Sequence, residues 1–291
     1  MQRPQQHESA EQSHRGDALR RAAPTSRRPS CSALGIRTTT MLRLPASKLF
    51  ELGSAAFEYV VAGTGKPSVV LINGSGGPIE GWHKVLPILS EATTTFAYNR
   101  PGLGKSTKPF RPQTAGTMVD DLRNLLLAVA VPRPWVLVGH SFGGLVANLF
   151  ARLHPNEVAG VVMLEATSPD DVSLLKRHEN ALQRGVAWVA NHLLPLNPNH
   201  ETLHALKSVA EIACAPAFPP LPLRVLTGTK PAMAWATNQE LLALRAKHQR
   251  SLAGLSQLGV HLEATQSGHF PQFTEAKLVT SAIKELVAAA H

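Results

Sequence analysis

Ser141 stands within a G-x-S-x-G pattern, residues 139–143, directly after the apolar run 135–138 and before a helix-compatible segment, 145–153. The two glycines permit a sharp turn from strand to helix, in which the serine takes a strained backbone conformation and its hydroxyl stands clear of the sheet. The N-terminus of the next helix would then point at any negative charge that forms there. Motif and context together predict that Ser141 is a nucleophile.

A serine hydroxyl is a weak nucleophile at neutral pH, so Ser141 needs a base, usually an imidazole that a carboxylate holds in place. His269 is the candidate among thirteen histidines, because it follows an expected strand, adjoins Gly268 and precedes the last expected helix. His140 is expected to point away from Ser141, since neighbours along a strand face opposite sides.

The elements that must position these residues alternate along the chain. The expected strands are 57–62, 69–73, 94–98, 135–139, 159–164, 223–227 and 260–264. The expected helices are 82–90, 117–130, 142–154, 235–257 and 274–289, and further helical segments lie near 171–194 and 200–213. Strand 69–73 is apolar along most of its length, as expected when helices cover both faces of a sheet. This alternation predicts an α/β fold with a mostly parallel central sheet flanked by helices.

At these motifs the chain resembles the α/β-hydrolase family over roughly residues 57–290. Four segments match in order: 69–77 resembles a strand with its oxyanion loop, 98–106 the next strand and its turn, 139–143 the nucleophile turn, and 267–270 the loop of the catalytic histidine. The resemblance implies a serine hydrolase, similar to an esterase, with His269 as its base. It also implies a helical cap insertion over the active site, here at about residues 168–222.

The acid that would hold His269 departs from the family's common pattern. That acid often follows the strand after the cap, but strand 223–227 and the residues just beyond it hold no carboxylate. Some members instead carry the acid after the strand that follows the nucleophile's helix, and here that residue is Glu165. A carboxylate at the end of so apolar a strand needs a partner or a shifted pKa. Asp170 is the alternative acid, and Asp171, Glu240 or no acid at all stay open.

The oxyanion hole of such an enzyme needs two backbone N–H donors. The resemblance implies that Phe142, directly after the nucleophile, gives one and that Ser75 gives the other. Asn73 stands where the family usually has histidine, and we expect its side chain to brace the loop.

Composition bounds the other possibilities. The chain has 291 residues, a formal net charge of +9, two cysteines and a mean hydropathy of −0.04. Residues 1–40 are polar and rich in arginine, and we expect a disordered tail before one domain, 41–291. No basic stretch is interleaved with aromatic residues, which argues against nucleic acid as a partner. No apolar run approaches the roughly 18 residues of a transmembrane helix. A cytoplasmic location is expected, with organelle targeting by residues 1–40 as the less favoured alternative.

The sequence therefore predicts a serine hydrolase that cleaves a carboxylic ester or a related acyl substrate through an acyl-enzyme on Ser141. No cofactor is required, and no metal-ligand spacing is present. The alternative is a non-catalytic α/β-hydrolase scaffold that binds a small ligand or a protein. A carboxylate within reach of His269 would discriminate between the two. The sequence does not indicate an oligomeric state.

Overall fold

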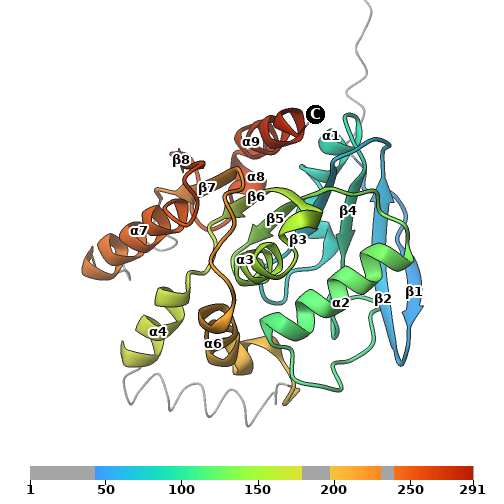
Figure 1. Cartoon of the computed structure of the whole chain (residues 1–291), viewed down its shortest axis with the longest axis horizontal. Coiled ribbons are helices and arrows are strands. Elements are labelled where there is room, and N and C mark those ends of the chain that lie inside the picture. The colour runs from blue at the N-terminus through green and yellow to red at the C-terminus, as the bar shows by residue number, and fades with distance from the viewer. Residues whose placement is uncertain (1–42, 179–196, 231–238, 291) are drawn as a thin grey trace, which may run out of the picture. The chain divides into compact units, whose positions relative to one another are not determined.

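The computed structural model describes residues 43–178, 197–230 and 239–290. These residues form an eight-stranded sheet in the order β1-β2-β4-β3-β5-β6-β7-β8 (Figure 1). The strands are β1 (Lys48–Leu52), β2 (Ala55–Ala62), β3 (Ser68–Ile72), β4 (Thr95–Tyr98), β5 (Trp135–His140), β6 (Val158–Leu164), β7 (Leu223–Gly228) and β8 (Gly259–Ala264). The β1–β2 and β2–β4 pairs are antiparallel, and every pair from β4 to β8 is parallel. The prediction of a mostly parallel sheet flanked by helices is confirmed.

Helices cover both faces of the sheet because its central strands are apolar on both sides. Val70 and Ile72 face a core that they share with α2 (Ala115–Ala128), α3 (Gly143–Leu153) and α6 (Ala205–Cys214). Val69 and Leu71 face the opposite core, which α1 (Leu86–Ser90) and α9 (Ala276–Ala289) complete. Successive residues of one strand thus anchor two separate hydrophobic layers.

The strand register brings the ends of the central strands to one edge of the sheet. Ile72 at the end of β3 pairs with Gly139 in β5, and His140 pairs with Leu164 at the end of β6. The loops after β3, β5 and β6 therefore begin side by side. In parallel sheets this carboxyl edge is where ligands and catalytic groups collect.

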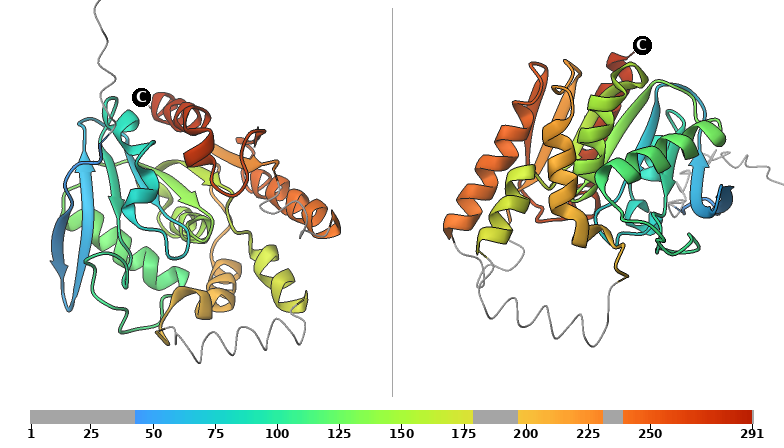
Figure 2. Two further views of the ribbon diagram at one scale, coloured as in Figure 1. Left: turned by 180° about the vertical axis from the view of Figure 1, so that it is seen from behind. Right: turned by 60° about the horizontal axis from the view of Figure 1, so that its bottom comes forward.

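Three helices lie together beyond this edge. α4 (Pro169–His178) contacts both α6 and α7 (Gln239–Ala253) and lies between them (Figure 2). The short 3-10 helix η3 (Glu201–His204) leads directly into α6. The middle of the expected cap, 179–196, lies outside the described residues, as does the expected tail, 1–40.

Several elements differ from the sequence expectation. The edge strand β1 was not expected, because its exposed, partly polar residues lack an apolar run. The expected helix 82–90 is a 3-10 helix, η1 (Ile79–Trp82), followed by α1, whose first turn contains Pro87. The expected helix 274–289 begins as a separate turn, α8 (Pro271–Thr274), and the chain leaves helical geometry at Glu275 before α9. Another 3-10 helix, η2 (Pro155–Glu157), links α3 to β6.

Among the described residues, no helix is long and apolar enough to cross a membrane.

Candidate active site

Ser141 lies in the turn between β5 and α3. Its φ is +50°, a left-handed conformation that residues other than glycine rarely adopt. The carbonyl oxygen of Ser141 accepts hydrogen bonds from the N–H groups of Gly144 and Thr167, both at 2.9 Å, and its own N–H donates to the Leu164 carbonyl at 3.0 Å. These backbone hydrogen bonds hold the strained turn in place.

The glycines of the G-x-S-x-G motif are needed for close backbone approach. A Cβ atom at position 139 would lie 2.5 Å from the carbonyl oxygen of Gly143. A Cβ atom at position 143 would lie 2.3 Å from the carbonyl oxygen of Ile72. Both distances are far inside van der Waals contact with backbone, so a side chain at either position would push α3 away from the sheet.

His269 reaches Ser141 from the loop between β8 and α8. Its Nε2 lies 3.1 Å from the Ser141 Oγ, which is hydrogen-bond distance for a base and its nucleophile. The side chain of His269 is 32% exposed, so the pair is open to a ligand from solvent. The tautomer that lets Nε2 accept the serine proton carries its own proton on Nδ1.

His140, the residue before Ser141, is buried beneath this loop. Its Nε2 donates to the carbonyl oxygen of His269 at 2.8 Å, and the two imidazole rings are 5.0 Å apart. Burial lowers the pKa of His140 to about 4, although the hydrogen bond to the His269 carbonyl acts in the opposite direction. His140 is therefore neutral at physiological pH and braces the His269 loop.

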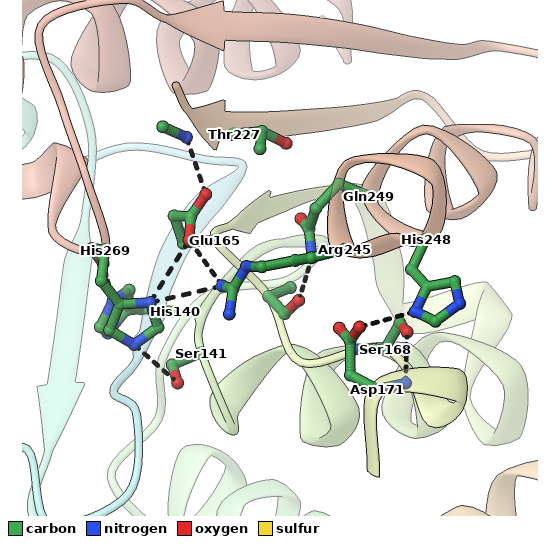
Figure 3. A network of polar contacts seen from close by, with 12 residues as sticks. His140, Ser141, Glu165, Ser168, Asp171, Thr227, Arg245, His248, Gln249 and His269 are labelled. Carbon is green, nitrogen blue, oxygen red and sulfur yellow. Dashed lines mark hydrogen bonds and ion pairs between the residues drawn. The ribbon is translucent and has the colours of Figure 1, made fainter. Parts of the chain in front are cut away.

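Glu165 follows β6 and is 4% exposed. Its Oε2 lies 3.4 Å from His269 Nδ1, and its Oε1 accepts a 2.7 Å hydrogen bond from the Gly228 N–H (Figure 3). Arg245 of α7 donates to Oε2 at 2.6 Å. Burial raises the pKa of Glu165, but the His269 hydrogen bond, the Arg245 charge and the Gly228 N–H together bring it below the usual value. The carboxylate is therefore ionised at neutral pH.

The other candidate acids lie elsewhere. Asp170 is exposed in the first turn of α4. The carboxylate of Asp171 pairs with His248 Nδ1 at 2.7 Å and accepts a hydrogen bond from the Ser168 N–H at 3.1 Å. Among the residues that the structure describes, Glu165 is the carboxylate that comes within hydrogen-bond reach of His269.

The loop after β3 is braced by a buried ion pair. Arg100 is 3% exposed and donates to the carbonyl oxygens of Asn73 and Gly74, both at 2.6 Å. Its remaining donors bind the Glu201 carboxylate at 2.6 and 2.9 Å, and that carboxylate also accepts from the Gly76 N–H at 3.3 Å. Because Arg100 binds both carbonyls, the peptide groups that join Asn73 to Gly74 and Gly74 to Ser75 are fixed in orientation.

The two expected oxyanion donors are the N–H groups of Ser75, in the loop after β3, and of Phe142, directly after Ser141. Asn73 braces the loop, because its Nδ2 donates to the Pro78 carbonyl at 2.6 Å. Within the described ranges, neither the Ser75 N–H nor the Phe142 N–H donates a hydrogen bond to another protein group. Both donors are therefore available to a ligand.

Comparison with known proteins agrees with this architecture. The sequence model of a family described as "alpha/beta hydrolase fold" matches residues 67–202. A thermophilic esterase from Thermogutta terrifontis superposes with a TM-score of 0.60 at 18% identity, over 85% of this chain and 100% of the esterase. The chain has the α/β-hydrolase fold.

Two curated relatives match about half or less of this α/β-hydrolase-fold chain. A soluble epoxide hydrolase from Corynebacterium sp. is 39% identical over 150 residues, which are 52% of this chain and 50% of that protein. An uncharacterized protein of Schizosaccharomyces pombe is 37% identical over 121 residues, 41% of this chain and 22% of that protein. The chain thus spans half or less of the length of these relatives.

Sequence reasoning missed two charged residues of this site. Arg245 and Glu201 come from α7 and η3, and they lie 80 and 101 positions from their partners Glu165 and Arg100. No local pattern marks either residue, because each is defined by a contact between distant segments. Within the described part of the chain, no group of three His, Cys, Asp or Glu side chains is arranged to hold a metal ion.

Proposed function

We propose that this protein is a serine hydrolase that cleaves a carboxylic ester or a related acyl substrate through an acyl-enzyme on Ser141. The observation that carries the proposal is the continuous line of contacts from Ser141 Oγ to His269 Nε2 at 3.1 Å and from His269 Nδ1 to Glu165 Oε2 at 3.4 Å. A nucleophile, a base and an ionised carboxylate in that order are the groups that acyl transfer requires.

In the proposed reaction, Ser141 Oγ attacks the substrate carbonyl carbon while His269 Nε2 takes the hydroxyl proton. Glu165 holds the Nδ1–H side of the imidazole and stabilises the imidazolium that forms. The N–H groups of Ser75 and Phe142 donate to the oxyanion of the tetrahedral intermediate. The imidazolium then returns its proton to the leaving alcohol as the C–O bond breaks, which leaves the acyl group on Ser141.

Water releases the acyl group by the same steps. His269 takes a proton from water as the water oxygen attacks the acyl carbon, and the returned proton restores the Ser141 hydroxyl. The products are a carboxylic acid and an alcohol. The side chain at position 141 also supports acyl chemistry against that of the epoxide hydrolase relative, since hydrolases of epoxides in this family use an aspartate at the nucleophile turn.

The experiment is turnover of p-nitrophenyl acetate, butyrate and octanoate by the wild type, Ser141→Ala and Ser251→Ala. Ser251 is an exposed serine on α7 and serves as the matched control. We expect Ser141→Ala to lose at least about 10³-fold in turnover and Ser251→Ala to match the wild type. Turnover by Ser141→Ala within tenfold of the wild type would contradict the proposal. A folded wild type that is inactive on all three esters would instead favour a ligand-binding scaffold.

A further inference from the structure

Helix α7 presents three side chains of one face to the segment that carries Glu165. Arg245, His248 and Gln249 are spaced three and four positions apart, so they share a face of the helix. The contacts are Arg245 Nη2 to Glu165 Oε2 (2.6 Å), His248 Nδ1 to Asp171 Oδ1 (2.7 Å) and Gln249 Nε2 to the Ala166 carbonyl oxygen (2.6 Å) (Figure 3). Because these contacts run from Glu165 into α4, α7 is fixed against the candidate acid and against the segment that follows it.

Arg245 and His269 meet at one oxygen atom of Glu165. Arg245 Nη2 lies 2.6 Å from Oε2, whereas His269 Nδ1 lies 3.4 Å from the same atom. The two nitrogens are 3.5 Å apart. The Gly228 N–H binds Oε1 and Arg245 binds Oε2, so both oxygens of the carboxylate are held independently of the imidazole. The guanidinium makes the shorter, charge-assisted hydrogen bond.

This arrangement has a chemical consequence for the base. A lone carboxylate beside an imidazole strongly favours its protonated form. Here the guanidinium balances the carboxylate charge and places a second positive charge beside Nδ1. An imidazole must be neutral at Nε2 to accept the serine proton. A balanced carboxylate therefore orients the base without holding it in the protonated, inactive form.

On the basis of the proposed serine hydrolase function, we propose that Arg245 is a positioning residue of the active site. It fixes the carboxylate of Glu165 and balances its charge, so that the carboxylate orients His269 without favouring the protonated imidazole. The side chain of Arg245 is 40% exposed, whereas that of Glu165 is 5% exposed. Arg245 is therefore on the solvent side of the pair, where it can be replaced without opening the core.

The other charged and titratable groups near His269 leave a clear pH window for a test. From β5, His140 has a pKa of about 4, lowered chiefly by burial, so it is neutral above about pH 5. Directly after β6, Glu165 has a pKa held below its usual value by His269, Arg245 and the Gly228 N–H, so it is ionised in the same range. His83 and Lys84 contact Phe273 on α8 rather than His269. Between pH 5 and pH 8, His140 and Glu165 therefore each keep one charge state, and neither adds a limb of its own to a rate profile.

The test measures the second-order rate of Ser141 labelling by a fluorophosphonate probe from pH 5 to pH 9, which needs no knowledge of the natural substrate. The proteins are the full-length wild type, Arg245→Met, Arg245→Lys and Lys247→Met. Lys247 is exposed on the same helix, so Lys247→Met removes the same charge away from the site. Thermal melts confirm that each variant is folded.

We expect Arg245→Met to move the acid limb of the profile upward by about one pH unit, because it removes a positive charge beside the imidazole. Its plateau rate should fall about tenfold, because the carboxylate loses a fixed position. In Arg245→Lys the acid limb should lie close to its wild-type position, since the charge is kept. Its plateau rate should stay below that of the wild type, since the planar guanidinium is lost. Lys247→Met should match the wild type.

Three results would overturn the inference. The first is an Arg245→Met profile that superimposes on that of the wild type. The second is an equal shift of the acid limb in Lys247→Met, which would mean that the shift comes from the net charge of the protein and not from the contact with Glu165. The third is a uniform loss of rate without movement of the limb in Arg245→Met and Arg245→Lys alike, which indicates a purely structural role. If the folded wild type is not labelled at any pH, the proposed serine hydrolase function is contradicted, and so is the role of Arg245 that rests on it.

Discussion

Replacing Glu201 by Gln should destabilise the protein strongly and also slow the reaction. The change keeps the side-chain shape but leaves the Arg100 guanidinium buried without a counter-charge, at 3% exposure. Breaking a buried ion pair by removing one partner costs about 3–5 kcal/mol. A change of 1 kcal/mol moves the melting temperature of a domain this size by about 2–4 °C, so we expect a decrease of about 6–20 °C.

The effect on the reaction follows from what Arg100 holds. Its two other hydrogen bonds fix the carbonyls of Asn73 and Gly74, and the Gly74 carbonyl belongs to the same peptide group as the Ser75 N–H. Loss of one oxyanion donor costs about 10²–10³-fold in rate, which sets the upper limit for a displaced loop. We therefore expect a slower turnover of p-nitrophenyl esters in Glu201→Gln, measured well below its melting temperature.

The assay combines urea unfolding, thermal melts and ester turnover, with Glu285→Gln as the control. Glu285 pairs with Arg224 at 3.4 Å and its side chain is 59% exposed, so its loss should cost no more than about 1 kcal/mol. The double variant Arg100→Met, Glu201→Leu should recover part of the stability but none of the rate, because it removes the buried charges together with the loop brace. A loss below about 1 kcal/mol in Glu201→Gln would refute the reasoning.

Two further predictions concern the acid and the buried imidazole. Glu165→Gln should lower ester turnover by about 10²–10⁴-fold, because the imidazole loses the charge that orients it, whereas Asp170→Asn should match the wild type; similar turnover in the two variants would contradict the assignment of the acid. The pKa of His140 is lowered from 6.5 to about 4 by burial, so the unfolded chain binds more protons there and stability falls as the pH falls through this window. His140→Gln keeps an N–H donor but cannot titrate, so the loss of unfolding free energy in urea between pH 7 and pH 5 should be smaller than in the wild type; an equal loss would contradict the prediction.

The sequence predicted those parts of the site that local patterns and strand ends specify. The turn at Ser141 follows from its glycines, and Glu165 and His269 each follow the end of an expected strand. Because parallel strands end at one edge of the sheet, residues far apart in sequence were expected to meet there. The structure brings all three within hydrogen-bond reach of one another in series.

The remainder depends on contacts that no local pattern encodes. Arg245 lies in a charged helix where an arginine is ordinary, and only the docking of α7 against residues 165–171 sets it on Glu165. Glu201 is likewise one acid in a polar stretch until η3 buries it against Arg100. Edge strand β1 was not predicted for a related reason. Its residues show only a weak apolar pattern, and pairing with β2 stabilises them as a strand.

The most direct test of the account is intact-mass measurement after treatment with a fluorophosphonate probe, on the wild type and on Ser141→Ala. The account predicts one covalent adduct per chain in the wild type and none in Ser141→Ala, because only an activated serine attacks the phosphorus. Labelling of Ser141→Ala to the same extent, or no labelling of a folded wild type, would contradict the claim that Ser141, His269 and Glu165 form a catalytic unit.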